Sequence, residues 1–246
     1  MPEIVDAAKL LRAGVLDELG VLIAGARDGA QQRSPSTFGA LAASACASLG
    51  ARVYEWSADA GGGGQTVPDG VDRLIVDAAA LYDAGEWSGR EQAGAATGAG
   101  DGAAGAASAD TGASAGTAAS AASASRAALR ACLDGAWEAS HAVANAAFIE
   151  PRRPGRIVYV APPSGRGRAA EGALAEAACA GLENLARTLS IEWARYEITA
   201  VAIAPGASTA GEEVAALCAY LASPAGAYFS GCLLDLRGTP TPPARA

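Results

Sequence analysis

The sequence predicts an α/β protein built around a three-layer, doubly wound parallel sheet of about six strands. Residues 156–161 and 198–204 are short apolar runs with β-branched residues, each followed by Pro, a pattern typical of buried strands. The residues between them are rich in Ala, Leu and Glu, and their leucines are spaced to form one apolar helical face. Two strands joined by a helix are parallel, because a long crossover returns the chain to the same end of the sheet.

The composition fits a single domain spanning residues 1–246, since 51% of the residues are hydrophobic and the length suits one α/β unit. The net charge of −8 argues against nucleic acid or an anionic membrane surface as a partner. No apolar run reaches the roughly 18 residues of a membrane span, and the first residues lack the apolar core of a signal peptide. We therefore expect a cytoplasmic protein.

The cysteines indicate neither a metal site nor a disulfide framework. All five are scattered along the chain, and no two of them form a C-x-x-C pair. Free thiols are typical of a reducing compartment, which agrees with the expected cytoplasmic location.

The other elements follow from the same kinds of pattern. Ala-rich or amphipathic segments predict helices, and short apolar runs beside Gly or Pro predict strands. The predicted helices are residues 3–19, 38–49, 126–148, 171–196 and 211–222, and the remaining strands predicted from these patterns are residues 20–26 and 52–56. Residues 58–70 form a Gly-rich connector, and residues 239–246 form a Pro-rich flexible tail.

Residues 92–124 are composed almost entirely of Ala, Gly, Ser and Thr. Ala favours a helix, but Gly and Ser dilute this preference, and the segment has no large side chain to bury. We therefore predict a disordered low-complexity loop inside the domain.

The segment from Arg156 to Ser208 resembles the second half of a short-chain dehydrogenase/reductase, a family with a Rossmann-type sheet. That family has a strand ending in Ser-Ser-x-x-Gly, a helix carrying Tyr-x-x-x-Lys and a strand ending in Pro-Gly. Here the first strand leads to Gly165, the last leads to Pro205 and Gly206, and the helix body GLENLARTLSIEWARYEI matches the run that follows the lysine. These landmarks set the register in which the functional positions are compared.

In this register other residues occupy the three catalytic positions of the family. Pro162 stands at the serine position, Ala175 at the tyrosine position and Cys179 at the lysine position. In the family the tyrosine gives a proton to the developing alkoxide, the lysine supports the tyrosine, and the serine orients the substrate. The resemblance therefore implies a reductase scaffold without its catalytic residues.

The loop that binds the cofactor in the family is also altered. The resemblance aligns Gly25, Gly29 and Gly39 with the three glycines of the dinucleotide-binding turn, where backbone N–H groups meet the pyrophosphate. Residues 30–38 form an insert where the family allows one residue. The insert is either a remodelled cofactor loop or a surface loop on a site that no longer binds dinucleotide. We prefer the second interpretation and expect no cofactor.

Two further departures concern the adenine side of the family's pocket. Ser57 stands where the family has the acid that binds the adenosine ribose. The connector at 58–70 leads straight to a strand within 71–80, which leaves no room for the family's third strand and its flanking helices. The family's Asn-Asn-Ala-Gly motif at the end of that strand is VDAA here, at 76–79. The third-strand region is thus predicted to be deleted.

Other chemically capable side chains have no partner at a recognisable spacing. His141 lies in the middle of the predicted helix 126–148 and is interpreted as a packed or surface histidine rather than a base. Cys132 stands where the family has an asparagine that supports the proton relay. Ser164 lies two residues past the serine position, and Tyr159 lies within a strand.

The preferred hypothesis is a non-catalytic subunit that assembles with an active short-chain dehydrogenase/reductase or with itself. In the family, the helices corresponding to residues 126–148 and 171–196 pair across a two-fold axis, and both keep their length and apolar faces here. One alternative is a divergent NAD(P)-dependent oxidoreductase that uses Ser164, His141 or Cys179. Another is a small-molecule-binding protein that reuses the crevice at the strand ends.

Overall fold

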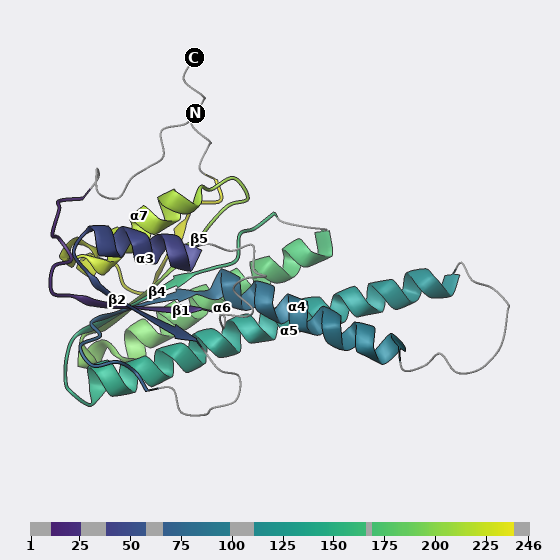
Figure 1. Cartoon of the computed structure of the whole chain (residues 1–246), viewed down its shortest axis with the longest axis horizontal. Coiled ribbons are helices and arrows are strands. Elements are labelled where there is room, and N and C mark those ends of the chain that lie inside the picture. Colours follow the sequence, from purple (N-terminus) through teal and green to yellow (C-terminus); the bar gives the residue numbers. More distant parts are fainter. Residues whose placement is uncertain (1–10, 26–37, 58–65, 99–110, 166–168, 239–246) are drawn as a thin grey trace, which may run out of the picture.

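The computed structural model describes residues 11–25, 38–57, 66–98, 111–165 and 169–238. Six strands form one sheet in the order β2-β1-β3-β4-β5-β6, and all neighbouring strands are parallel (Figure 1). The strands are β1 (Gly20–Gly25), β2 (Arg52–Ser57), β3 (Arg73–Asp77), β4 (Gly155–Val160), β5 (Ile198–Ala204) and β6 (Cys232–Asp235). The predicted parallel six-stranded α/β fold is confirmed.

The strand order reverses between β1 and β3. From β1 the chain passes through α3 (Phe38–Ser48) to β2 at one edge, and β3 then pairs with the other side of β1. No strand in the described part of the chain lies outside β2, as expected if the third-strand region is deleted. The reversal places the carboxyl ends of β1 and β3 next to each other.

Helices cover both faces of the sheet, so the strands are buried on both sides. Leu22, Leu74 and Ile157 belong to the core shared with α4 (Ala78–Gly98), α5 (Thr111–Val143) and α6 (Ala169–Glu192). Their neighbours along the same strands, Val21, Ile75 and Val158, belong to the core shared with α3 and α7 (Gly211–Ala222). This alternation follows from the two-residue side-chain period of a strand.

The helices α4 and α5 form a hairpin that extends well beyond the sheet (Figure 1). This corrects the predicted disordered loop at 92–124, because α4 continues to Gly98 and α5 begins at Thr111. Residues 99–110 lie outside the described residues. A Cβ atom on Gly85 of α4 would lie 2.5 Å from the Cβ atom of Ala131 on α5. The close packing that such small residues permit offsets the low helix propensity of Gly and Ser.

The helix predicted at 3–19 is wrong in its described part, and residues 1–10 lie outside the described residues. Residues 13–18 form turns instead. Gly14 and Glu18 have φ angles of 74° and 68°, in the left-handed region, which a right-handed helix cannot include.

The other predicted helices are confirmed with small shifts at their ends, except that the helix predicted at 126–148 begins earlier, at Thr111. The helix α5 continues as a π-helical segment over Ala144–Ile149, and α6 is followed by a 3-10 turn over Ala194–Tyr196. A further 3-10 turn over Pro224–Tyr228 joins α7 to β6. The predicted tail at 239–246 lies outside the described residues.

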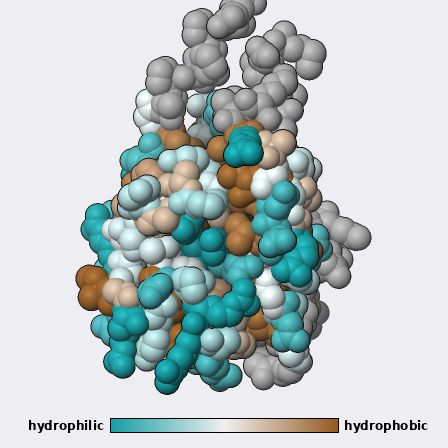
Figure 2. Space-filling view, turned by 90° about the vertical axis from the view of Figure 1, so that its left-hand side faces the viewer, coloured by the Kyte–Doolittle hydropathy of each residue, from teal (hydrophilic) through white to brown (hydrophobic). Residues whose placement is uncertain are grey.

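One face of the molecule mixes polar and apolar residues (Figure 2). Figure 2 shows the side of the molecule away from the α4–α5 hairpin, where apolar patches are interspersed with hydrophilic residues. Within the described ranges, no helix combines the length and the apolar character needed to cross a membrane.

Candidate functional site

The carboxyl ends of β1 and β3 meet where the strand order reverses, which is where open α/β sheets bind ligands. The strand β1 ends at Gly25, and β3 ends at Asp77. The helix α3 begins at Phe38, and α4 begins at Ala78, directly after β3. The N–H ends of two helices therefore lie close to one point at this edge, and each carries a partial positive charge.

The Asp77 carboxylate lies between these two helix N-termini. Its Oδ2 atom accepts a hydrogen bond from the backbone N–H of Gly39 at 2.7 Å, and Oδ1 accepts one from the N–H of Ala80 at 3.0 Å. The side chain is buried. Asp77 is thus the N-cap of α4 and also satisfies an amide in the first turn of α3, where helix geometry leaves the N–H groups without partners.

The predicted cofactor glycines have different places in the structure. Gly39 is packed against Asp77, because a Cβ atom on Gly39 would lie 3.1 Å from the Asp77 Oδ2 atom. Gly25 ends β1, whereas Gly29 lies outside the described residues. The same is true of residues 30–37, so Phe38 is the only part of the predicted insert that the structure describes, and it begins α3.

The three catalytic positions inferred from the resemblance hold no proton donor of the expected kind. Pro162 follows the carboxyl end of β4 and is buried. Ala175 and Cys179 lie one turn apart on α6, where they are only 5% and 3% exposed and belong to the apolar core. Burial raises the pKa of the Cys179 thiol, and Arg237 partly opposes that shift. These side chains pack, and none of them offers the hydroxyl or ammonium group that the family's reaction uses.

Cys132 and Ser164 also have structural partners. Cys132 on α5 is buried in the same core as Cys179; burial raises the pKa of its thiol, and the charge of Asp77 raises it further. The backbone N–H of Ser164 donates to the carbonyl of Pro205 at 3.2 Å, which joins the turn after β4 to the end of β5.

His141 and Tyr159 have partners on α5 and on the π-helical segment that follows it. His141 is exposed on α5, where its ring lies 5.5 Å from that of Trp137 and its Nε2 atom lies 3.1 Å from Nδ2 of Asn145. Tyr159 is fully buried, burial raises its pKa, and its hydroxyl lies 2.6 Å from Oγ of Ser140. In the described part of the chain, no group of three or more His, Cys, Asp or Glu side chains is placed to hold a metal ion.

Two carboxylates at the carboxyl edge have roles that the sequence patterns left unassigned. One is Asp77, and the other is Asp235 at the end of β6. Asp235 accepts hydrogen bonds from Nε and Nη2 of Arg237 at 2.8 and 2.7 Å. Arg237 lowers the pKa of Asp235 to about 2. An Asp that ends an apolar strand just before an Ala-rich run is an N-cap signal, so the role of Asp77 on α4 was open to prediction; its bond to Gly39 depends on the fold.

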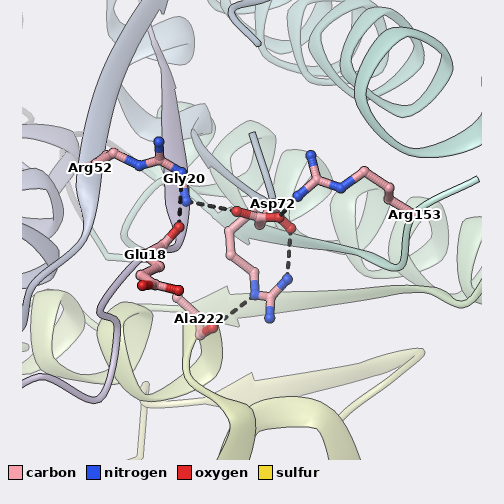
Figure 3. A network of polar contacts seen from close by, with 7 residues as sticks. Glu18, Gly20, Arg52, Asp72, Arg153 and Ala222 are labelled. Carbon is pink, nitrogen blue, oxygen red and sulfur yellow. Dashed lines mark hydrogen bonds and ion pairs between the residues drawn. The ribbon is translucent and has the colours of Figure 1, made fainter. Parts of the chain in front are cut away.

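A polar network ties the opposite, amino-terminal edge of the sheet together. Asp72, just before β3, accepts a hydrogen bond from the N–H of Gly20 at 2.8 Å and pairs with Arg153 at 2.5 Å (Figure 3). Arg73 donates from Nε to the carbonyl of Ala222 at 2.9 Å, at the end of α7. These contacts join segments far apart in the sequence, so their role is structural.

Solved structures of dehydrogenases have a similar fold. A citronellol catabolism dehydrogenase (AtuB) from Pseudomonas aeruginosa PAO1 matches with a TM-score of 0.55 and 22% identity over 94% of this chain and 98% of that one. A short-chain dehydrogenase from Mycobacterium smegmatis matches with a TM-score of 0.57 and 18% identity over 98% of each chain. No protein-family model matches the sequence, and the search of curated proteins finds no match. At these identities the likeness shows a shared fold.

Proposed function

We propose that this chain is a non-catalytic subunit with the scaffold of a short-chain dehydrogenase, which assembles with an active homologous subunit or with itself. The observation that carries this proposal is the packing of Ala175 and Cys179 into the apolar core beside α5. Reduction of a carbonyl by hydride needs a proton at the developing alkoxide. Ala175 has none to give, and the buried Cys179 thiol has a raised pKa.

The assembly surface in this proposal is formed by α5 and α6. Each helix carries a large apolar side chain that remains in contact with solvent: Trp137 on α5 is 46% exposed and Ile191 near the end of α6 is 75% exposed. Aromatic and aliphatic side chains of this size contribute most when they are buried at the centre of an interface. Both helices keep the continuous length that a helix-to-helix contact between subunits needs.

A turnover assay tests the catalytic half of the proposal. The purified chain is mixed with NADH or NADPH and a panel of aldehydes and ketones, and the absorbance of the reduced nicotinamide is followed. We expect no carbonyl-dependent oxidation. Oxidation at the rate of an ordinary reductase would contradict the proposal.

Co-expression tests the assembly half. A tagged copy of this chain is expressed with a homologous reductase from the same source that carries a complete Tyr-x-x-x-Lys motif. We expect the two chains to elute together in a fixed ratio, and the glutamate variant of Ile191 to weaken the association. Glutamate at Tyr228, which is 93% exposed on another element, is the matched control and should have no effect. A chain that captures neither the reductase nor itself would contradict the proposal.

A divergent NAD(P)-dependent oxidoreductase is the second candidate, favoured by the scaffold shared with known dehydrogenases. It would need a hydroxyl or thiol near the carboxyl edge, and Ser164 is a partly exposed residue there. If the turnover assay is positive, the alanine variant of Ser164 should abolish the activity under this hypothesis, whereas it should leave the association with a partner chain unchanged.

A further inference from the structure

We propose that Asp77 is an internal anion that occupies the phosphate-binding end of α3 and so keeps dinucleotides out of the crevice at the strand-order reversal. This inference rests on the proposed function and adds the physical reason that the scaffold would not take NAD(P). It makes Asp77 a specificity-determining residue for the site.

The first argument is competition for one hydrogen-bond donor. A pyrophosphate group in this kind of sheet is held by backbone N–H groups at the start of the helix that follows β1, here α3. The N–H of Gly39, in the first turn of α3, already donates to the Asp77 carboxylate at 2.7 Å. A phosphate oxygen and this carboxylate oxygen cannot both lie at the same amide at hydrogen-bond distance without two anions coming into contact.

The second argument concerns how firmly Asp77 is held. Its other oxygen accepts from the N–H of Ala80 at 3.0 Å, and the side chain is only 4% exposed. Asp77 is also the last residue of β3, which pairs with β1 on one side and β4 on the other. A ligand that displaced the carboxylate would therefore uncap α4 and leave a buried charge without these partners, which is unfavourable.

The third argument concerns how far the electrostatic effect of the Asp77 charge extends. Burial is the largest cause that raises the thiol pKa of Cys132 on one face of the sheet and of Cys218 on the other. The charge of Asp77 is a further cause for both thiols. Arg237, which lowers the thiol pKa of Cys179, is already engaged with Asp235 through two hydrogen bonds. Arg237 therefore gives a diphosphate little compensation for the presence of Asp77.

The lack of a side chain at Gly39 agrees with this contact. A Cβ atom at this position would lie 3.1 Å from Oδ2 and 3.3 Å from Cβ of Asp77. The absence of a side chain at residue 39 thus makes room for the protein's own carboxylate. The glycine that the sequence pattern assigned to a cofactor has an intramolecular role in this structure.

The test is the Asp77→Asn variant of the full chain. Asn keeps an oxygen for the N–H of Ala80, since Asn is also a favourable N-cap, and it removes the negative charge. NADH, NADPH and inorganic pyrophosphate are titrated by calorimetry into the wild type and the variant. We expect no measurable binding to the wild type at millimolar ligand. In the variant we expect measurable binding, at least about tenfold tighter than that detection limit, because the repulsion between anions is removed.

Asp72→Asn is the matched control. Asp72 borders the same strand at its other end and likewise accepts from a glycine N–H, that of Gly20 at 2.8 Å. This variant removes the same charge from the opposite edge and should leave nucleotide binding unchanged. Equal gains in the two variants would indicate a general effect of net charge and would overturn the assignment to Asp77.

Asp77→Ser provides a second variant, because Ser also caps helices without a charge, and circular dichroism reports whether each variant is folded. The inference is overturned if a folded variant binds no better than the wild type. It is also overturned if the wild type itself binds NADH with a micromolar dissociation constant. This measurement does not depend on whether the variants fold. If the wild type binds NADH but does not turn over a carbonyl substrate, only the role of Asp77 is contradicted. If the wild type turns over such a substrate, the proposed function is contradicted.

Discussion

At the scale of single residues, buried charged groups meet backbone atoms at the ends of helices. Asp77 does so at the start of α4, and Arg156 of β4 does so at the end of α7, where its Nη1 atom donates to the carbonyls of Leu221 at 2.6 Å and Ser223 at 2.5 Å. The carbonyl end of a helix carries a partial negative charge and lacks intrahelical donors. Burial lowers the pKa of Arg156 to about 10, so the guanidinium is still a cation at neutral pH.

Replacing Arg156 with Met should lower the free energy of unfolding by about 2 to 3 kcal/mol, because two buried carbonyls lose charged donors. The change is measured by urea denaturation followed by circular dichroism. Arg187→Ala is the control, since Arg187 pairs with Glu183 on the exposed surface of α6 and should contribute less than about 0.5 kcal/mol. Equal effects of the two substitutions would contradict a special role for Arg156.

The thiols give a second prediction at this scale. Cys46, Cys132, Cys179 and Cys218 are buried, whereas Cys232 is partly exposed, and burial is the first cause that raises the pKa of all five. At mildly alkaline pH, iodoacetamide should therefore modify Cys232 first and the other four only after unfolding. Mass spectrometry of the native protein checks this order. Rapid native labelling of Cys179 would instead support the hypothesis of a divergent enzyme that uses this thiol.

At the scale of elements, the sequence correctly predicted those strands and helices in which large apolar residues recur at a regular spacing. The strands around Ile157 and Val201 and the helix around Leu182 are each buried in the core as their spacing implies. The hairpin was not predicted, because its close contacts are between small residues such as Gly89 and Ala124, which belong to different helices. Pairing of this kind leaves no hydrophobic period in either segment, so local pattern favoured a disordered loop.

The site shows the same division between local and long-range information. The replacements at Pro162, Ala175 and Cys179 follow from the order of residues along the chain. The bond from Gly39 to Asp77 joins residues on two elements that are remote in the sequence, and no spacing rule connects them. Sequence reasoning therefore identified the replaced catalytic positions, whereas the contact of Gly39 with Asp77 is known only from the fold.

The hairpin yields a prediction at the element scale. A Cβ atom on Gly85 would lie 2.9 Å from the carbonyl oxygen of Ala127, and one on Gly89 would lie 2.6 Å from Cα of Ala124. Either Gly→Ala substitution should lower stability by about 1 to 2 kcal/mol, because the clash outweighs the gain of about 1 kcal/mol in helix propensity. Ser88→Ala, on the exposed face of α4, is the control and should have little effect in the same thermal unfolding measurement. A stabilising effect at Gly85 and Gly89 would show that the helices are not in close contact.

At the scale of the whole molecule, the sheet is covered by helices on both faces, and the outward sides of α5 and α6 form the proposed association surface. Trp137 and Ile191 are the large apolar side chains exposed there. If the chain associates through this surface, Trp137→Glu and Ile191→Glu should each shift the assembly toward monomer, because a buried carboxylate without a partner is unfavourable. Sedimentation velocity measures the shift.

The same experiment distinguishes this surface from others. Tyr228→Glu changes an equally exposed aromatic residue outside α5 and α6 and should leave the sedimentation coefficient unchanged. An assembly that responds to Tyr228→Glu and not to the two helix variants would place the contact on the side of α7 and β6.

The hairpin also affects how the chain reaches its native topology. The 33 residues of α5 rise about 50 Å, whereas a six-residue strand such as β4 covers only about 20 Å. Residues 78–154 separate β3 from β4, although these strands are neighbours in the sheet. Loop closure over so many flexible residues carries a large entropic penalty. If α4 and α5 pair early in folding, they bring the two ends of this segment close together. The hydrogen bonds between β3 and β4 can then form over a much shorter effective loop.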